Sequence, residues 1–291
     1  MSQTHIVVIH GLASKPPEAT LHERYRRHLS ESLPNEFPEA QFHTVYWADL
    51  MGYSPPDGPE EDEYQEDGEN FQSYSFFEET KFLLGGLLRS KSADFVEAKM
   101  SEAMQNPKLH ATAIGSIIDS LPAHLAGKPA RRLYDRFLPD LHRYFFGNRR
   151  NDVLSRLTAK LESIPENAHV CLIAHSMGSI IALDAIVSGR PINTLITIGS
   201  PLGITVVQEQ LGLDSAAKES LATKVGHWFN LYDRLDVVAL DNDLADDFEP
   251  MIVNDIRVRN FFVNKDGERN HHKSYGYLRT PELGGIVQEL L

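Results

Sequence analysis

The serine at position 176 and its neighbours constrain the fold of this chain more than any other feature. Ser176 is the central residue of the run Ala-His-Ser-Met-Gly at 174–178. A short apolar segment of β type, 168–173, precedes this run, and a segment with helical spacing, 179–187, follows it. A turn that leads directly from a strand into a helix brings the residues two before and two after its centre against the neighbouring backbone, so only Ala or Gly fits there. Ala and Gly occupy these positions, and we predict a strand–turn–helix unit that presents Ser176 at the turn.

Length and charge narrow the class of protein. The 291 residues suffice for one large α/β domain, and we expect a single domain over 1–291. The formal net charge of −13 argues against nucleic acid or an anionic membrane surface as a partner, because both attract basic patches. No apolar run approaches the roughly 20 residues of a membrane span, so we expect no stable membrane insertion. The first strand begins shortly after Met1 without a charged and then apolar leader, which predicts a cytoplasmic protein, and the oligomeric state stays open.

Strand-like and helical segments alternate along the chain. The segment 4–9 is rich in β-branched residues without interruption, as expected of a strand buried on both faces of a parallel sheet. Helical spacing begins at Thr20, where Glu23 completes a capping box. The expected strands are 4–9, 41–47, 168–173, 193–198, 225–232 and 256–264, and the expected helices are 20–32, 151–163, 179–187, 215–223 and 281–291. The alternation predicts the α/β class, with a mostly parallel central sheet flanked by helices.

Residues 50–150 interrupt this alternation. Eight carboxylates stand among Pro and Gly at 57–69, which is typical of a solvated acidic loop. Over 76–146 the apolar residues keep helical spacing. We therefore expect a helical insertion between two strands, either as a cap over the site or packed elsewhere on the domain.

Residues suited to acid–base chemistry follow the serine along the chain. A serine hydroxyl needs a base to become a nucleophile, and the base needs an acid to orient it. Downstream of Ser176, the loops after strands offer Asp233 or Asp236 as the acid and His271 or His272 as the base. These loops lie beyond the carboxyl ends of strands, where open α/β sheets place their sites. We therefore predict a catalytic triad of the serine, one of these aspartates and one of these histidines.

Asp236 is the preferred acid. It precedes Val237 and Val238, which would anchor its loop in the core. Asp233 stands next to Arg234, and a structural salt bridge is the simpler expectation for that carboxylate.

Two backbone N–H groups are candidates for an oxyanion hole. Met177 follows the serine at a helix N-terminus, where the helix dipole also favours negative charge. Leu12 follows His10 and Gly11 at the end of the first strand, and Gly11 lets the backbone approach a substrate closely. We predict Leu12 and Met177 as the oxyanion donors, and we expect no metal site.

These segments together resemble the α/β-hydrolase superfamily. The resemblance covers His10-Gly11, 174–179, 197–202, 228–238 and 271–272. More narrowly, the chain is similar to lipase- and esterase-like serine hydrolases with a Gly-His-Ser-Met-Gly nucleophile elbow, a Gly-Ser-Pro turn and a Trp-x-Asn…Asp-x-Val acid segment. The sequence departs from this pattern at Ala174, where the family has Gly, and at Val237, where it has Pro.

The resemblance implies the α/β-hydrolase fold, with the helical insertion as a possible cap, and it implies roles for two residues. Asp236 takes the acid role, and a histidine shortly before Tyr275 or Tyr277 takes the base role. We prefer His272 to His271 on this ground and because Ser274 and Tyr275 follow it.

The function expected from these residues is that of a serine hydrolase. It would cleave a small-molecule carboxylic ester through an acyl-Ser176 intermediate, without a cofactor. Thioesterases and acyltransferases are variants of the same chemistry. The alternative is a hydrolase-derived protein that has lost turnover and binds a partner.

Overall fold

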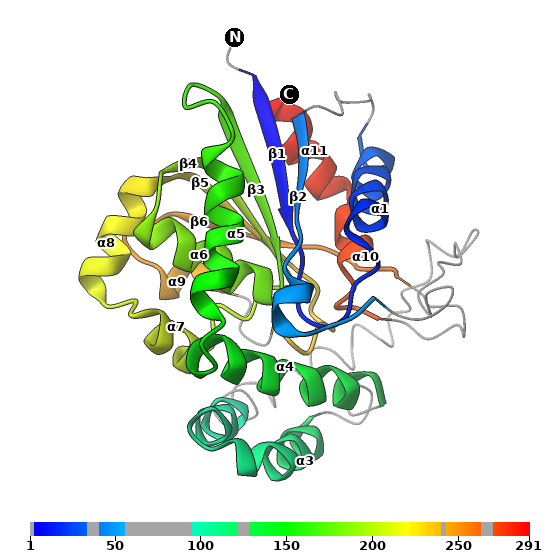
Figure 1. The fold of residues 1–291 in the computed structure, drawn as a ribbon, viewed down its shortest axis with the longest axis vertical. Coiled ribbons are helices and arrows are strands. Elements are labelled where there is room, and N and C mark those ends of the chain that lie inside the picture. The colour runs from blue at the N-terminus through cyan, green and yellow to red at the C-terminus, as the bar shows by residue number, and fades with distance from the viewer. Residues whose placement is uncertain (1–2, 34–40, 56–94, 122–127, 240–242, 263–269) are drawn as a thin grey trace.

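Six parallel strands form one central sheet. The computed structural model describes residues 3–33, 41–55, 95–121, 128–239, 243–262 and 270–291 (Figure 1). The strands are β1 (Thr4–Ile9), β2 (Phe42–Val45), β3 (His169–His175), β4 (Ile192–Ile198), β5 (Val225–Tyr232) and β6 (Val253–Arg257). They lie in the order β2-β1-β3-β4-β5-β6, and every neighbouring pair is parallel. The parallel sheet predicted from the sequence is therefore confirmed.

Helices cover both faces of this sheet. They are α1 (Glu18–Glu31), α3 (His110–Ser120), α4 (Lys128–Phe146), α5 (Arg150–Glu162), α6 (Met177–Ser188), α7 (Thr205–Leu211), α8 (Ser215–Lys224), α9 (Leu244–Asp247), α10 (Ser274–Leu278) and α11 (Pro281–Leu290), with short 3₁₀ helices at Ala48–Met51 and Pro107–Leu109. Figure 1 shows α1, α10 and α11 on one face and α5, α6 and α8 on the other. The α/β class with flanking helices is confirmed as well.

Alternate side chains of each strand supply two separate cores. In β1, Ile6 and Val8 pack with apolar side chains of α1, α10 and α11. Val7 and Ile9 point to the opposite face and join the larger core that α5 and α6 cover. A strand buried on both faces in this way has to be apolar at consecutive positions, which is the pattern of 4–9.

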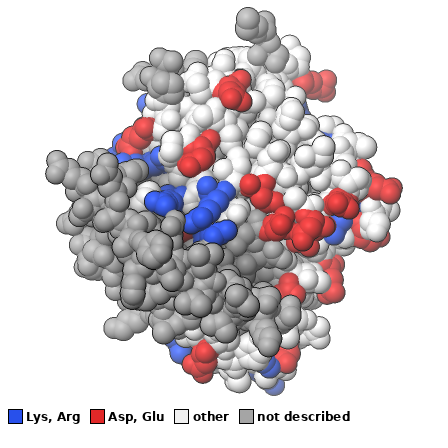
Figure 2. Space-filling model, turned by 180° about the vertical axis from the view of Figure 1, so that it is seen from behind, with Lys and Arg blue, Asp and Glu red and all other residues white. Residues whose placement is uncertain are grey.

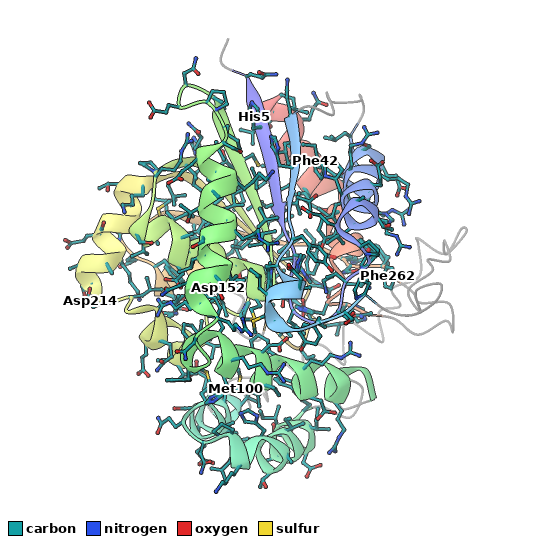
Figure 3. The ribbon with its side chains drawn as sticks, in the orientation of Figure 1. His5, Phe42, Met100, Asp152, Asp214 and Phe262 are labelled. Carbon is teal, nitrogen blue, oxygen red and sulfur yellow. The ribbon has the colours of Figure 1, made fainter. Side chains whose placement is uncertain are left out.

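From residue 95 onward, the described parts of the insertion 50–150 are mostly helical. A helix over 95–105 precedes α3 and α4, and α4 crosses the carboxyl ends of the strands (Figure 1). Figure 3 places Met100, in this insertion, at the end of the molecule opposite to His5 in β1. The predicted acidic loop, 57–69, lies outside the described residues.

Two predicted elements differ from the structure. The first helix begins at Glu18 and has Pro17 as its N-cap, so the capping box predicted at Thr20 does not form. The last strand, β6, ends at Arg257 and does not continue through 258–262, because side chains bind the backbone there; residues 263–264 of the predicted strand lie outside the described residues. The Asn260 N–H donates to Asp233 Oδ2 at 2.7 Å, and the Phe262 N–H donates to Asn260 Oδ1 at 3.1 Å, which turns the chain away from the sheet.

The charge on the described surface is unevenly distributed. Figure 2 shows Lys and Arg gathered mainly in one patch near the middle of the face opposite to that of Figure 1, with acidic side chains in several groups around it. The net charge therefore does not make every face acidic. Among the described helices, none has the length and apolar character that a membrane crossing requires.

Replacing a side chain in the middle of the sheet should destabilise the fold strongly. Ile173 of β3 is completely buried. We expect Ile173→Ala to lower the free energy of unfolding by about 2–5 kcal/mol, because it removes buried methyl groups and leaves a cavity. The control is Ile252→Ala, since Ile252 is 76% exposed and its loss should cost less than about 0.5 kcal/mol. Urea unfolding measures both values, and equal losses would contradict this description of the core.

Candidate active site

The strand–turn–helix unit predicted around Ser176 is present. β3 ends at His175 and α6 begins at Met177, so the serine alone forms the turn. Its φ is 53° and its ψ is −126°, a backbone conformation that residues other than glycine adopt rarely. A Cβ at Gly178 would stand 2.7 Å from the carbonyl oxygen of His10. The absence of a side chain at Gly178 therefore lets α6 begin directly against the end of β1.

Ser176 lies at the topological switch point of the sheet. After β2 has been added on one side of β1, the chain returns and adds β3 on the other side. β1 pairs with β2 on one side and with β3 on the other. The loop after β1 leads to α1 on one face, and the turn after β3 leads to α6 on the other face. Open α/β sheets bind ligands at such a switch point. The geometry thus brings the segment that holds Leu12 beside Ser176.

Three side chains form a continuous chain of hydrogen bonds. His272 Nε2 lies 2.8 Å from Ser176 Oγ. On the other side of the ring, His272 Nδ1 lies 2.8 Å from Asp236 Oδ2 and 2.9 Å from Oδ1. A carboxylate only accepts, so Nδ1 carries the proton and Nε2 is free to accept the serine O–H. The imidazole is thereby held in the tautomer that can take a proton from the serine.

The Asp236 carboxylate is buried, and further donors hold it in place. The Val238 N–H donates to Oδ1 at 2.9 Å, and the Tyr277 hydroxyl donates to Oδ2 at 2.8 Å. Burial raises the pKa of Tyr277 well above its usual range, and the charge of Asp236 adds to this effect. The phenol therefore remains a neutral donor to the carboxylate.

The two alternative residues pair with each other. His271 Nδ1 lies 3.2 Å from Asp233 Oδ2, which also accepts the Asn260 N–H at 2.7 Å. Asp233 Oδ1 accepts the Leu235 N–H at 2.8 Å. Neither Asp233 nor His271 is hydrogen-bonded to Ser176 within the described chain. This second pair fixes the loops that carry Asp236 and His272.

The direction of the Leu12 N–H is set by a buried histidine. His10 Nδ1 donates to the Gly11 carbonyl at 2.6 Å, and His10 Nε2 accepts the Trp47 backbone N–H at 2.9 Å. Burial lowers the pKa of His10 well below its usual range, which keeps this ring neutral. The N–H and C=O of a trans peptide point in opposite directions, so the Gly11 carbonyl bond orients the Leu12 N–H. No described residue accepts a hydrogen bond from that N–H.

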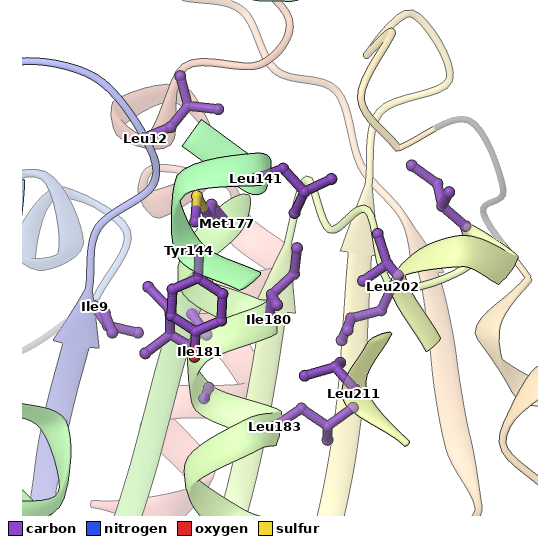
Figure 4. Close-up of a cluster of buried hydrophobic side chains, with 14 of the residues drawn as sticks. Ile9, Leu12, Leu141, Tyr144, Met177, Ile180, Ile181, Leu183, Leu202 and Leu211 are labelled. Carbon is purple, nitrogen blue, oxygen red and sulfur yellow. The ribbon is translucent and has the colours of Figure 1, made fainter. Parts of the chain in front are cut away.

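The second predicted donor, Met177, is the first residue of α6. Backbone N–H groups in the first turn of a helix lack an intrahelical acceptor, and the helix dipole makes this end favourable for negative charge. Leu12, Met177, Leu141 and Ile180 belong to one apolar cluster, in which Figure 4 shows Met177 beside Tyr144 and Leu12 toward its edge. An anion that forms here would meet backbone donors in apolar surroundings.

Sequence reasoning missed two residues that support the histidine. His175 Nε2 donates to the carbonyl oxygen of His272 at 2.7 Å, and the two ring centroids are 4.8 Å apart. Gly199 has a φ of 55°, and a Cβ there would stand 2.7 Å from Asp236 Oδ2 and 3.2 Å from His272 Nδ1. No sequence pattern indicated this role for His175, whereas the Gly-Ser-Pro turn marked the position of Gly199.

This arrangement can activate an oxygen nucleophile. As Ser176 Oγ approaches an electrophilic carbon, His272 can take its proton, and Asp236 stabilises the imidazolium that results. The backbone N–H groups of Leu12 and Met177 are the predicted donors for a developing oxyanion. Among the described residues, no group of three or more His, Cys, Asp or Glu side chains is arranged to hold a metal ion.

Comparisons with known proteins give no match: no family model fits the chain, and no curated protein or solved structure is similar to it at a significant level.

Adding one methyl group at Gly199 should disturb the site. We expect Gly199→Ala to lower the rate at which Ser176 reacts with a fluorophosphonate by at least about tenfold, because the new Cβ displaces Asp236 from His272. The control is Gly212→Ala. Gly212 has a similar φ of 68°, but nothing lies within 4 Å of its Cβ position, so this variant bears the backbone strain alone. Equal rates for the two variants would show that close packing at Gly199 does not matter to the serine.

Proposed function

We propose that the protein is a serine hydrolase that cleaves carboxylic esters through an acyl-Ser176 intermediate. The observation that carries the proposal is the continuous hydrogen-bonded chain from Ser176 Oγ through His272 to Asp236, with N···O distances of 2.8 Å on both sides of the imidazole. In this proposal Ser176 is the nucleophile, His272 the general base and Asp236 the orienting acid.

The first half of the reaction forms the acyl-enzyme. Ser176 Oγ attacks the ester carbonyl while His272 Nε2 takes its proton. The carbonyl oxygen becomes an oxyanion that accepts hydrogen bonds from the N–H groups of Leu12 and Met177. When the tetrahedral intermediate collapses, His272 returns the proton to the alkoxide, and the alcohol leaves.

The second half repeats these steps with water. His272 removes a proton from a water molecule, which attacks the acyl group on Ser176, and the carboxylic acid leaves as the serine regains its proton. A thioester would enter the same cycle with a thiol as leaving group. An acyl transfer would replace the water by a second alcohol.

Topology supports assignment to the α/β-hydrolase fold. The sheet is parallel, the serine stands at a strand-to-helix turn, and the acid and the base follow it in the chain order Ser, Asp, His that this fold uses. Ser176 follows β3, Asp236 follows β5 and His272 follows β6. The site therefore gathers loops from the carboxyl edge of the sheet, as the fold requires.

A fluorophosphonate tests the nucleophile directly. We expect one adduct on the wild-type protein and none on Ser176→Ala, measured by intact mass, because only an activated serine displaces the fluoride. Ser176→Ala removes one oxygen and keeps the volume of the turn nearly unchanged. An adduct on both proteins would place the nucleophile elsewhere. No adduct on either would favour the non-catalytic, partner-binding alternative.

Two neighbouring aspartates allow a matched test of the acid. We expect Asp236→Asn to lower ester turnover by about 10⁴-fold, because an amide permits the wrong tautomer of His272. Asp233→Asn should lower it by less than about tenfold, since Asp233 contacts His271 and backbone N–H groups instead of the base. The measurement is kcat of both variants on one ester. A larger loss in Asp233→Asn than in Asp236→Asn would assign the acid role to Asp233.

A further inference from the structure

The insertion helix α4 is hydrogen-bonded to the loop after β5 that carries Asp236, called the acid loop below. The Tyr134 hydroxyl donates to the carbonyl oxygen of Val237 at 2.7 Å, and both groups are buried. Val237 follows Asp236 directly in the chain. These residues are 103 positions apart, so only the tertiary fold brings them together.

The peptide group that Tyr134 binds is the one that holds the acid. The Val237 carbonyl and the Val238 N–H belong to one planar peptide unit, and its N–H donates to Asp236 Oδ1 at 2.9 Å. Hydrogen bonds therefore run from the Tyr134 hydroxyl through this peptide to Asp236, and from there to His272. Bonds in such a series polarise and strengthen one another.

Tyr134 is suited to this role at any ordinary pH. It is 1% exposed. Burial raises its pKa far above the usual range, and the nearby charge of Asp236 raises it further. Its hydroxyl stays protonated and has a single hydrogen to donate, which the Val237 carbonyl receives.

A second tyrosine attaches the other end of α4 to the helix that follows the serine. The Tyr144 hydroxyl donates to Asp184 Oδ2 of α6 at 2.7 Å, and Arg150 binds the same carboxylate at 2.6 and 2.7 Å. Ten residues separate the two tyrosines, a span of about 15 Å along a helix. Figure 4 shows Leu141 and Tyr144 packed with Met177, Ile180 and Ile181. Movement of α4 away from the sheet would break both hydroxyl bonds and expose this cluster.

We propose that Tyr134 is a positioning residue for Asp236 and that α4 remains in place over the carboxyl edge of the sheet during turnover. This proposal rests on the proposed function, because it assigns Asp236 to the acid. The helix then acts as a fixed brace between the acid loop and α6, and it does not open as a lid.

The test compares Tyr134→Phe with Tyr144→Phe. Each variant removes one hydroxyl from the same helix and keeps the ring, but only Tyr134 is linked to the acid. We expect Tyr134→Phe to lower the rate of fluorophosphonate labelling of Ser176 roughly fivefold. We also expect its pH–rate profile to shift to lower pH, because a carboxylate held less firmly stabilises the protonated imidazole less. Tyr144→Phe should lower the melting temperature while leaving rate and profile within about twofold of wild type.

The outcomes separate this proposal from the proposed function. Labelling of wild-type Ser176 with identical rates and pH profiles for Tyr134→Phe would overturn the positioning role alone. No labelling of the wild type would overturn the proposed function and this inference with it. Hydrogen exchange on the wild-type protein tests the brace without any variant. We expect amides between Tyr134 and Tyr144 to exchange as slowly as those of α6, and rapid exchange confined to α4 would contradict a fixed helix.

Discussion

The close approach of the end of β1 to the turn at Ser176 is the constraint on which the site depends. Gly178, in the first turn of α6, packs against the His10 carbonyl. A Cβ at Gly178 would stand 2.7 Å from that carbonyl oxygen. Gly11 leaves room from the other side, since a Cβ there would stand 2.7 Å from His175 Nδ1 and 2.8 Å from the Ser176 Cβ. Two facing glycines thus set the distance between two adjacent loops. The surrounding packing holds Ser176 at a positive φ, and the backbone strain is stored at this residue.

The same physical device fixes both sides of the site. His10 binds one end of a planar peptide and thereby orients the Leu12 N–H at the other end. Tyr134 binds the carbonyl end of a second peptide, whose N–H from Val238 holds Asp236. In each case a buried, neutral ring binds a rigid backbone unit next to the candidate site. Because a peptide unit is planar, fixing its carbonyl also fixes the direction of the N–H at its other end. A long side chain with several rotatable bonds does not have this property.

The sequence predicts local features of this molecule better than long-range ones. Small residues around Ser176 and unbroken apolar strands follow from local sterics and burial, and the predicted parallel sheet was confirmed. The sequence narrows the acid and base to neighbouring pairs, but which pair faces the serine depends on loop conformation. The support from Tyr134 has no sequence signal, because its partner is a backbone carbonyl 103 positions away, and the bond from the Trp47 N–H that holds the His10 ring spans 37 positions. The end of β6 was mispredicted because the side chains of Asp233 and Asn260 accept the backbone N–H groups of Asn260 and Phe262, in place of a neighbouring strand.

The contributors to the site are scattered along the chain, from His10 to Tyr277, with an insertion helix among them. Ser176 and His272 are 96 positions apart in the chain, and Asp236 lies between them. An unfolded or half-synthesised chain therefore carries a serine hydroxyl no more nucleophilic than one in free solution. Under the proposed function, the chemical reactivity of Ser176 would therefore report on the integrity of the tertiary structure.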